Sequence, residues 1–243
     1  DYDGDGDLDL VVGSCCVLTT TIKLGDGKGN FVAGNPMNAR FSTNGALADV
    51  DADGFLDLIA LDGRANVQII DLPLGDGKGG WRVLTQTSTP GTGQQEVALG
   101  DFNGDKVIDF AAPTVGTDNV SVMLNTGKGV FKGTAYAAGK GTGTAAAGDV
   151  DGDGKLDVVS GAATDRMISV FRGNGDGTFK AKTDVAAPNG INANLSLVDM
   201  NGDGKLDAVF DNLTTTFVAV GDGKGGFAAP LQVAVRDAYQ NPV

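Results

Sequence analysis

One nine-residue pattern of aspartate, asparagine and glycine occurs five times at nearly regular intervals, and this repetition constrains the fold more than any other feature. The copies, which we call loops one to five, begin at Asp1, Asp49, Asp101, Asp149 and Asp199, so successive starts are 48, 52, 48 and 50 residues apart. A fixed period of this length indicates an array in which each repeat is one supersecondary unit. We therefore expect residues 1–243 to form a single repeat domain.

Four alternate positions of each loop, numbered 1, 3, 5 and 9, carry a side-chain oxygen. Calcium is a hard cation that binds about six to eight oxygens from carboxylates, amides, backbone carbonyls and water. A short loop whose alternate residues point inward supplies such a set, so the sequence predicts one Ca²⁺ site in each loop, or about five ions. The predicted side-chain ligands of loops one to five are Asp1, Asp3, Asp5 and Asp9; Asp49, Asp51, Asp53 and Asp57; Asp101, Asn103, Asp105 and Asp109; Asp149, Asp151, Asp153 and Asp157; and Asp199, Asn201, Asp203 and Asp207.

Loop three departs from the others at position 6. Four loops have glycine there, which supplies a positive φ at low cost where the backbone folds round an ion. Loop three has Lys106, which adds both a Cβ and a positive charge. We expect its calcium site to be the weakest of the five.

The loops begin like those of EF-hands but do not continue like them. An EF-hand needs a bidentate glutamate at position 12 and a helix on either side. Position 12 is here Val12, Ala60, Ala112, Ser160 or Phe210, and strand-like apolar residues follow position 9. Solvated Asp-Gly turns are the remaining alternative, and they fit a single copy better than five copies in one register.

The composition agrees with metal loops and excludes several classes of function. All 31 acidic residues except Glu96 are aspartates, the net charge is −13, and five Ca²⁺ would offset ten of these charges. Because close carboxylates repel one another, we expect the metal-free form to be loosened. The acidity argues against nucleic acid as a partner, and the sequence has no apolar run long enough to predict a membrane span. The chain has no His, the usual general base, and we expect it not to be an enzyme.

Between the loops the sequence predicts four strands per repeat and essentially no helix. An apolar run precedes each loop from the second onward, another follows the loop, and a third alternates apolar and polar residues, as in 120–124. A glycine-rich turn then leads to a looser fourth strand through an aromatic residue, which we expect to pack between repeats: Phe31, Trp81, Phe131, Phe179 or Phe227. Repeated four-stranded antiparallel units describe an all-β, β-propeller-type array. Its five expected blades are approximately residues 1–40, 41–90, 91–139, 140–189 and 190–243.

The loop of residues 1–9, followed by the turn of residues 25–31, recurs in phase five times, and this pattern resembles the FG-GAP / VCBS repeat family. Blades of that family occur in integrin α-subunit heads and in many secreted bacterial proteins. The resemblance implies that each loop lies between the first two strands of its blade and binds Ca²⁺. It also implies that backbone carbonyls at position 7 complete the ligand sets, namely those of Asp7, Phe55, Val107, Lys155 and Lys205.

Two departures from that family leave the arrangement of the blades open. The family usually closes with seven blades, whereas this sequence has five loops, and nothing precedes Asp1 to form the inner strand of the first blade. The chain is interpreted as part of a larger propeller, as a five-bladed ring in which residues 238–243 complete blade one, or as a unit of an open assembly in which one subunit's tail completes the next subunit's first blade. Unpaired strand edges of such an open array invite strand addition.

The favoured function is that of a secreted or cell-surface calcium-binding protein for adhesion or extracellular scaffolding. Extracellular modules bind calcium at about 10⁻⁴–10⁻³ M, which suits loops of this kind. The expected partners are an extracellular protein, a glycan or further copies of the chain, including as a subunit of a filament. A lectin is the alternative and a calcium-dependent polysaccharide lyase is a weaker one. The adjacent Cys15 and Cys16 are expected to be free thiols, with a vicinal disulfide or a link to another chain as alternatives.

Overall fold

The protein is described by a computed structural model that covers residues 1–13, 20–36, 45–61, 67–94, 96–187, 190–191, 193–212 and 214–235. The expectations for Cys15, Cys16 and residues 238–243 lie outside these ranges. Within them all regular structure is β, as the sequence predicts. The same residues contain no helix with the length and apolar character that a membrane span requires.

Nineteen strands form five antiparallel sheets in the described residues, and each sheet is a meander whose neighbours follow one another in sequence. The first sheet has three strands, β1 (Leu10–Val12), β2 (Thr21–Gly25) and β3 (Phe31–Ala33). The second and third sheets have four each: β4 (Gly45–Ala48), β5 (Asp57–Leu61), β6 (Ile69–Gly75) and β7 (Trp81–Ser88); then β8 (Ala98–Gly100), β9 (Asp109–Thr114), β10 (Asn119–Asn125) and β11 (Phe131–Ala137).

The last two sheets repeat this order. They consist of β12 (Thr142–Gly148), β13 (Asp157–Ala162), β14 (Met167–Phe171) and β15 (Thr183–Ala186), and of β16 (Ala193–Val198), β17 (Asp207–Asp211), β18 (Thr215–Ala219) and β19 (Leu231–Val235). The predicted four-stranded blades are therefore confirmed, with a first blade that lacks its inner strand in the described residues. The second strand begins at position 9 of the loop in blades two to five and one residue later, at Leu10, in the first blade.

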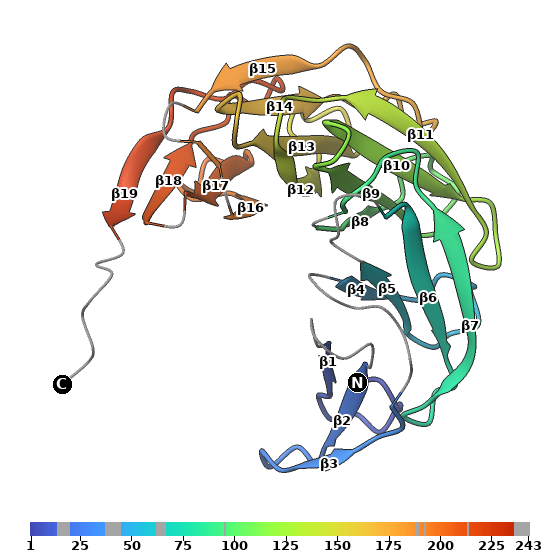
Figure 1. Ribbon diagram of the computed structural model, residues 1–243. Helices are drawn as coiled ribbons and strands as arrows, with labels where there is room; N and C mark the ends of the chain where they lie inside the picture. Colours follow the sequence, from blue (N-terminus) through green and yellow to red (C-terminus); the bar gives the residue numbers. More distant parts are fainter. Residues whose placement is uncertain are drawn as a thin grey trace.

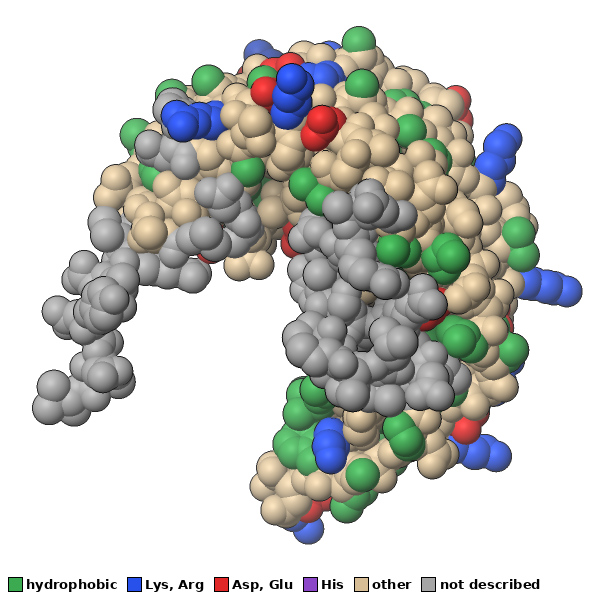
Figure 2. Space-filling view, viewed as in Figure 1, with side chains coloured by type: hydrophobic (Ala, Val, Ile, Leu, Met, Phe, Trp, Pro, Cys, Tyr) green, Lys and Arg blue, Asp and Glu red, His purple; other side chains and the backbone are tan. Residues whose placement is uncertain are grey.

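The five sheets follow one another around an arc, with the first strand of each sheet on the inner side and the last on the outer side (Figure 1). In the described residues the arc stays open between β19 and the first sheet (Figure 1). Figure 2 shows several basic side chains along the outer rim of this arc. The arrangement is that of a propeller-type array, and the described residues do not form a closed five-bladed ring.

The hydrophobic core lies between adjacent sheets rather than inside any one of them. One cluster joins blades two and three through side chains such as Ile59, Leu72 and Phe110, and a second joins blades three and four. The third cluster joins blades four and five, where Val150, Val170 and Phe210 are buried together. Each blade therefore depends on its neighbours for burial, as expected of a repeat array.

The glycine-rich turn of each blade lies directly against the aspartate-rich loop of the same blade. In blade two, a Cβ on Gly75 would come within 2.2 Å of the Leu56 carbonyl oxygen. Gly77 has a φ of +64°, and a Cβ there would meet the ring of Phe55, which lies at position 7 of loop two. Glycine is needed at these positions because no side chain fits between turn and loop.

The only glutamate of the chain forms a contact between blades three and four. Glu96 precedes β8, and its Oε2 accepts a hydrogen bond from the Ala145 N–H of β12 at 2.9 Å. Burial raises the pKa of Glu96 from 4.5 to about 7, although the hydrogen bond from Ala145 lowers it. The protonated form is therefore the one that the folded state favours.

We expect the stability of the folded chain to fall as the pH rises from about 4.5 to 7 because of this group. A carboxyl group with a raised folded-state pKa contributes stability that is present below its unfolded pKa and is lost as the pH rises through its folded pKa. Glu96→Gln should remove this dependence and stabilise the chain by about 1–2 kcal/mol at pH 8. Urea unfolding of both proteins at pH 5 and pH 8 measures the difference, and equal effects of the substitution at both pH values would contradict the expectation.

Candidate calcium sites

Each loop is wrapped around the carboxylate of its first aspartate. In loop four, Asp149 Oδ1 accepts hydrogen bonds from the N–H groups of Gly152 at 2.7 Å and Asp153 at 3.2 Å, and Oδ2 accepts one from Gly154 at 2.9 Å. The bond from position 6 to the first aspartate recurs in loops one, two, three and five. The backbone at position 7 is fixed as well, because its N–H donates to the position 5 side chain in all five loops.

This wrapping brings the predicted ligands together. In three loops, three carboxylates each offer an oxygen, and these oxygens lie within 4.8 Å of one another: Asp1, Asp3 and Asp5; Asp49, Asp51 and Asp53; and Asp149, Asp151 and Asp157. In loops three and five the position 3 ligand is Asn103 or Asn201, whose Oδ1 accepts the N–H of position 5 at 2.9 Å. Oxygen donors from alternate residues are the set that calcium prefers.

Loop two shows most directly that the arrangement fits a cation. Asp51 Oδ1 is buried and accepts no hydrogen bond. A buried carboxylate oxygen without a partner is costly in the absence of a bound group. A cation held by Asp49, Asp51 and Asp53 would satisfy this oxygen, so the residues present fit a calcium ion.

The position 9 aspartates have a second role, which the sequence pattern does not indicate. In loop four, the buried Asp157 accepts the Val150 N–H on Oδ2 at 2.9 Å and the Gly173 N–H on Oδ1 at 2.8 Å. Each of the other four loops has the same two bonds, from position 2 and from the first residue of the glycine-rich turn. The carboxylate therefore ties the loop to the turn at the end of the third strand. Since each carboxylate oxygen has two lone-pair sites, a role as ligand remains a prediction.

Burial opposes the charge of these tying carboxylates. Desolvation raises the pKa of Asp57 and that of Asp109 to about 6, against the lowering effect of their two backbone hydrogen bonds. The pKa of Asp157 is raised by the same cause. Neighbouring carboxylates of the same loop raise these pKa values further, and a bound divalent cation would oppose both effects.

Two loops contain a residue other than glycine in a left-handed conformation. Lys106, at position 6 of loop three, has a φ of +68°, and its N–H still donates to Asp101 Oδ2 at 2.8 Å. Ala52, at position 4 of loop two where the other loops have glycine, has a φ of +61°. The loop conformation is thus kept at the expense of local strain, since side chains with a Cβ disfavour this region.

We expect Lys106→Gly to strengthen calcium binding at loop three. The substitution removes both the strain and a positive charge from the ion's surroundings, so the dissociation constant of this site should fall by about tenfold, a free-energy change of about 1.4 kcal/mol. Calorimetric calcium titration of the two proteins compares their weakest sites. A weakest site with the same affinity in both proteins would show that loop three does not limit binding.

The loops also hold neighbouring blades together. The backbone carbonyl at position 2 accepts an N–H from the glycine-rich turn of the next blade: Gly129 donates to Val50 at 2.9 Å, and Gly177 donates to Phe102 at 2.9 Å. Gly225 donates to Val150 at 3.1 Å in the same way. At the first joint the Tyr2 hydroxyl instead donates to the Gly80 carbonyl at 3.1 Å.

The aromatic residues of the turns pack at the same joints, as predicted. The Trp81 ring lies 5.0 Å from that of Tyr2, and the Phe179 ring lies 5.7 Å from that of Phe102, measured between centroids. Phe131 and Phe227 pack against the clusters that join their blades to the preceding ones. Phe31, in the first sheet, differs from them because the residue is 46% exposed.

The sequence pattern did not indicate that basic side chains contact the carboxylates of the loops. Arg82 contacts Asp51 and Asp53, Lys155 and Lys180 approach Asp153, and Lys205 approaches Asp203. Arg82 and Lys180 each follow the aromatic residue of their turn. This shared position was the only available signal in the sequence, and it does not reveal that the side chain reaches back to the loop.

Comparison with known proteins shows which fold this architecture represents. The chain is similar to a lectin of Agrocybe aegerita, described as specific for non-reducing terminal N-acetylglucosamine, with 20% identity and a TM-score of 0.62 over 98% of this chain and 65% of the lectin. A weaker likeness is to the Photorhabdus luminescens Tc holotoxin pore, with 18% identity and a TM-score of 0.46 over 98% of this chain and 12% of the toxin chain. Another is to the V. cholerae biofilm matrix protein Bap1, with 19% identity and a TM-score of 0.49 over 96% of this chain and 38% of that protein. The chain thus spans about two thirds of the lectin's length and less of the others.

Two comparisons of sequence complete the assignment. No curated protein sequence matches the chain. The family of FG-GAP-like repeats matches four overlapping segments, residues 1–60, 49–112, 101–160 and 149–210, which together cover most of the sequence and agree with its loops and blades. The chain therefore belongs to the family of FG-GAP-like repeat proteins.

Proposed function

We propose that this chain is a calcium-binding repeat protein that acts in adhesion or as an extracellular scaffold, and that calcium makes its blades rigid. The observation that carries the proposal is loop two, where three carboxylates converge and Asp51 Oδ1 is buried without a hydrogen-bond partner. The hydrogen bonds from position 6 to the first aspartate and from position 7 to the position 5 side chain occur in all five loops. The proposed ligands are the twenty side chains and five backbone carbonyls predicted above.

The proposed action of calcium follows from where the loops lie. A bound ion would supply positive charge that holds the carboxylates of a loop together. Loops two to five each join the inner strand of their blade to the second strand. The position 2 carbonyl of loops two, three and four accepts a hydrogen bond from the next blade, as Val50 does from Gly129. An ordered loop would thus keep two successive blades in a fixed relation. Holding the blades in this way requires no catalytic group, and the proposal includes no catalysis.

A calcium titration tests the proposal at a defined site. Asp49→Asn/Asp51→Asn removes two charges from loop two and leaves the buried Asp57, which ties loop to turn, in place. Calorimetry should show one calcium ion fewer per chain for this variant than for the wild type. Asp222→Asn, in the exposed part of the last glycine-rich turn, is the control and should leave the number of ions unchanged. Failure of the wild type to take up calcium at millimolar concentration would refute the proposal.

An extracellular location is part of the proposal because calcium in that compartment matches the affinity of such modules. The likeness in fold to a lectin favours glycan binding as the second candidate function. A glycan array probed in calcium and in EGTA separates the candidates. Binding to a defined terminal sugar supports the lectin function, whereas calcium-dependent self-association in sedimentation experiments, without glycan binding, supports the scaffold.

A further inference from the structure

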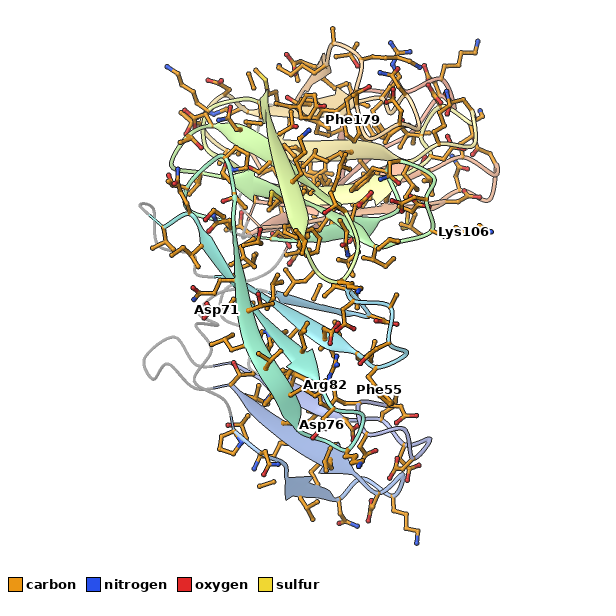
Figure 3. All side chains as sticks on the ribbon, turned by 90° about the vertical axis from the view of Figure 1, so that its right-hand side faces the viewer. Phe55, Asp71, Asp76, Arg82, Lys106 and Phe179 are labelled. Carbon is orange, nitrogen blue, oxygen red and sulfur yellow. The ribbon has the colours of Figure 1, made fainter. Side chains whose placement is uncertain are left out.

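Arg82 holds two carboxylates of loop two with a single guanidinium group. Its Nη2 lies 2.8 Å from Asp51 Oδ2 and 2.6 Å from Asp53 Oδ2. Its Nε donates to the Gly75 carbonyl oxygen at 2.5 Å, which fixes the side chain at the end of β6. Figure 3 shows Arg82 near Phe55, the residue at position 7 of this loop. The guanidinium therefore joins the loop to the turn and strand of its own blade.

Both carboxylates belong to the proposed calcium ligands, and the contact leaves them unequal. Asp51 uses only Oδ2 for Arg82, so its buried Oδ1 stays unpartnered. Asp53 accepts Arg82 on Oδ2 and the Phe55 N–H on Oδ1 at 3.0 Å, so both of its oxygens are engaged. A calcium ion that used Asp53 Oδ2 would consequently compete with the guanidinium for that oxygen.

The other blades lack this double contact among the ion pairs of the described residues. The residue that follows the aromatic is Val32, Lys132, Lys180 or Ala228 in the remaining blades. Lys180 reaches a single ligand, with its Nζ 3.8 Å from Asp153 Oδ2. A flexible ammonium at that distance is easily displaced, whereas the planar arginine side chain is preorganised for several donors at once.

We propose that Arg82 is an internal cation that takes the place of calcium at loop two, and that calcium must displace it to bind there. The inference rests on the proposed function, since it assumes that loop two is a calcium site. Without calcium, Arg82 holds Asp51 and Asp53 together and neutralises part of their repulsion. With calcium, a divalent ion at about 2.3–2.6 Å from the same oxygens repels the guanidinium. Loop two is then both the most ordered loop at low calcium and one that fills late.

The backbone strain at Ala52 supports the proposal that Arg82 holds loop two together when calcium is absent. Loop two keeps the conformation of the other loops although Ala52 has a φ of +61°, which disfavours a residue with a Cβ. Arg82 adds two charge-assisted contacts across the loop, which are stronger than neutral hydrogen bonds. The guanidinium therefore stabilises a loop that has lost the glycine found at position 4 elsewhere.

The chain contains its own reporter for this site, because its only tryptophan, Trp81, precedes Arg82. Fluorescence of Trp81 during a calcium titration should follow the displacement of the guanidinium. Because Trp81 also contacts Tyr2 of loop one, the Asp49→Asn/Asp51→Asn variant identifies the part of the signal that belongs to loop two. Arg82→Gln removes the charge and keeps an amide that can donate to Gly75. Lys180→Gln is the matched control at the equivalent position of blade four.

We expect Arg82→Gln to lower the calcium concentration at the midpoint of the loop-two signal by about tenfold, and Lys180→Gln to leave it unchanged. Arg82→Lys, which keeps the charge but loses the second contact, should give an intermediate midpoint. In EGTA, hydrogen exchange of the Phe55 amide should be at least several-fold faster in Arg82→Gln than in the wild type, because Asp53 is no longer held.

The outcomes separate this inference from the proposed function. If the wild type takes up no calcium, both are refuted. If calcium binds and Arg82→Gln leaves the midpoint unchanged, the inference alone fails. A midpoint that moves to higher calcium would also overturn it, because Arg82 would then assist the ion by positioning Asp51 rather than compete with it. The exchange rate of Phe55 tests the metal-free part of the inference whether or not calcium binds.

Discussion

Calcium is expected to stabilise the folded chain by about 7 kcal/mol when its free concentration is ten times the dissociation constant of the sites. A ligand that binds only the folded state contributes RT ln(1 + [L]/Kd). This is about 1.4 kcal/mol for each site at a tenfold excess over its own dissociation constant, or about 7 kcal/mol when all five sites reach that excess. The physical cause is the relief of repulsion among carboxylates such as those of Asp1, Asp3 and Asp5, each of which has an oxygen within 4.8 Å of the others.

Urea unfolding in EGTA and in calcium measures this stabilisation, with magnesium at the same concentration as control. Magnesium demands a smaller octahedral set of ligands and gives up its water reluctantly. It should therefore stabilise the chain much less than calcium. Equal unfolding midpoints in EGTA and in calcium would show that the loops are not calcium sites of the folded chain.

Asp157→Ala is expected to destabilise the metal-free chain by about 2–4 kcal/mol. The buried side chain accepts the N–H groups of Val150 and Gly173, and its removal leaves both donors without a partner at about 1–3 kcal/mol each. Part of this loss is offset because burial of the carboxylate already opposes its charge, as the raised pKa of Asp157 indicates. The loss should be the largest for any single side chain of loop four.

Asp151→Ala is the matched control for this substitution. In EGTA it should change stability by less than about 1 kcal/mol, because Asp151 accepts one long bond, from Asp153 at 3.2 Å, in an exposed part of the loop. In calcium both variants should lack the ion of loop four. Urea unfolding under both conditions makes the comparison. If the two variants are equally stable in EGTA, Asp157 serves only as a ligand and does not tie the loop to the turn.

Much of the fold could be predicted from the sequence because local signals agree with one another. The five loops, the alternation in residues 120–124 and the glycine-rich turns all indicate the same four-stranded unit, and the observed β10 (Asn119–Asn125) contains residues 120–124. The order of strands then follows, because short connections favour antiparallel neighbours.

The contacts between loops and their surroundings could not be predicted in the same way. The pattern suggests a ligand role for Asp157 but not its bonds to Val150 and Gly173, which depend on how the third strand returns to the loop. Arg82 lies 29 residues beyond Asp53 in sequence. It reaches Asp53 only because β7, which begins at Trp81, pairs with β6 in the same blade as loop two. The expectations for Cys15 and Cys16 lie outside the residues that the structure describes.

The central claim is that calcium in the loops fixes the relation between successive blades. Hydrogen exchange of the amides of Gly129, Gly177 and Gly225 tests it most directly. Each of these N–H groups donates to the position 2 carbonyl of the loop in the preceding blade. The account predicts that exchange at all three amides is at least about tenfold slower in millimolar calcium than in EGTA. Exchange rates that are the same in both solutions, while calcium is bound, would contradict it.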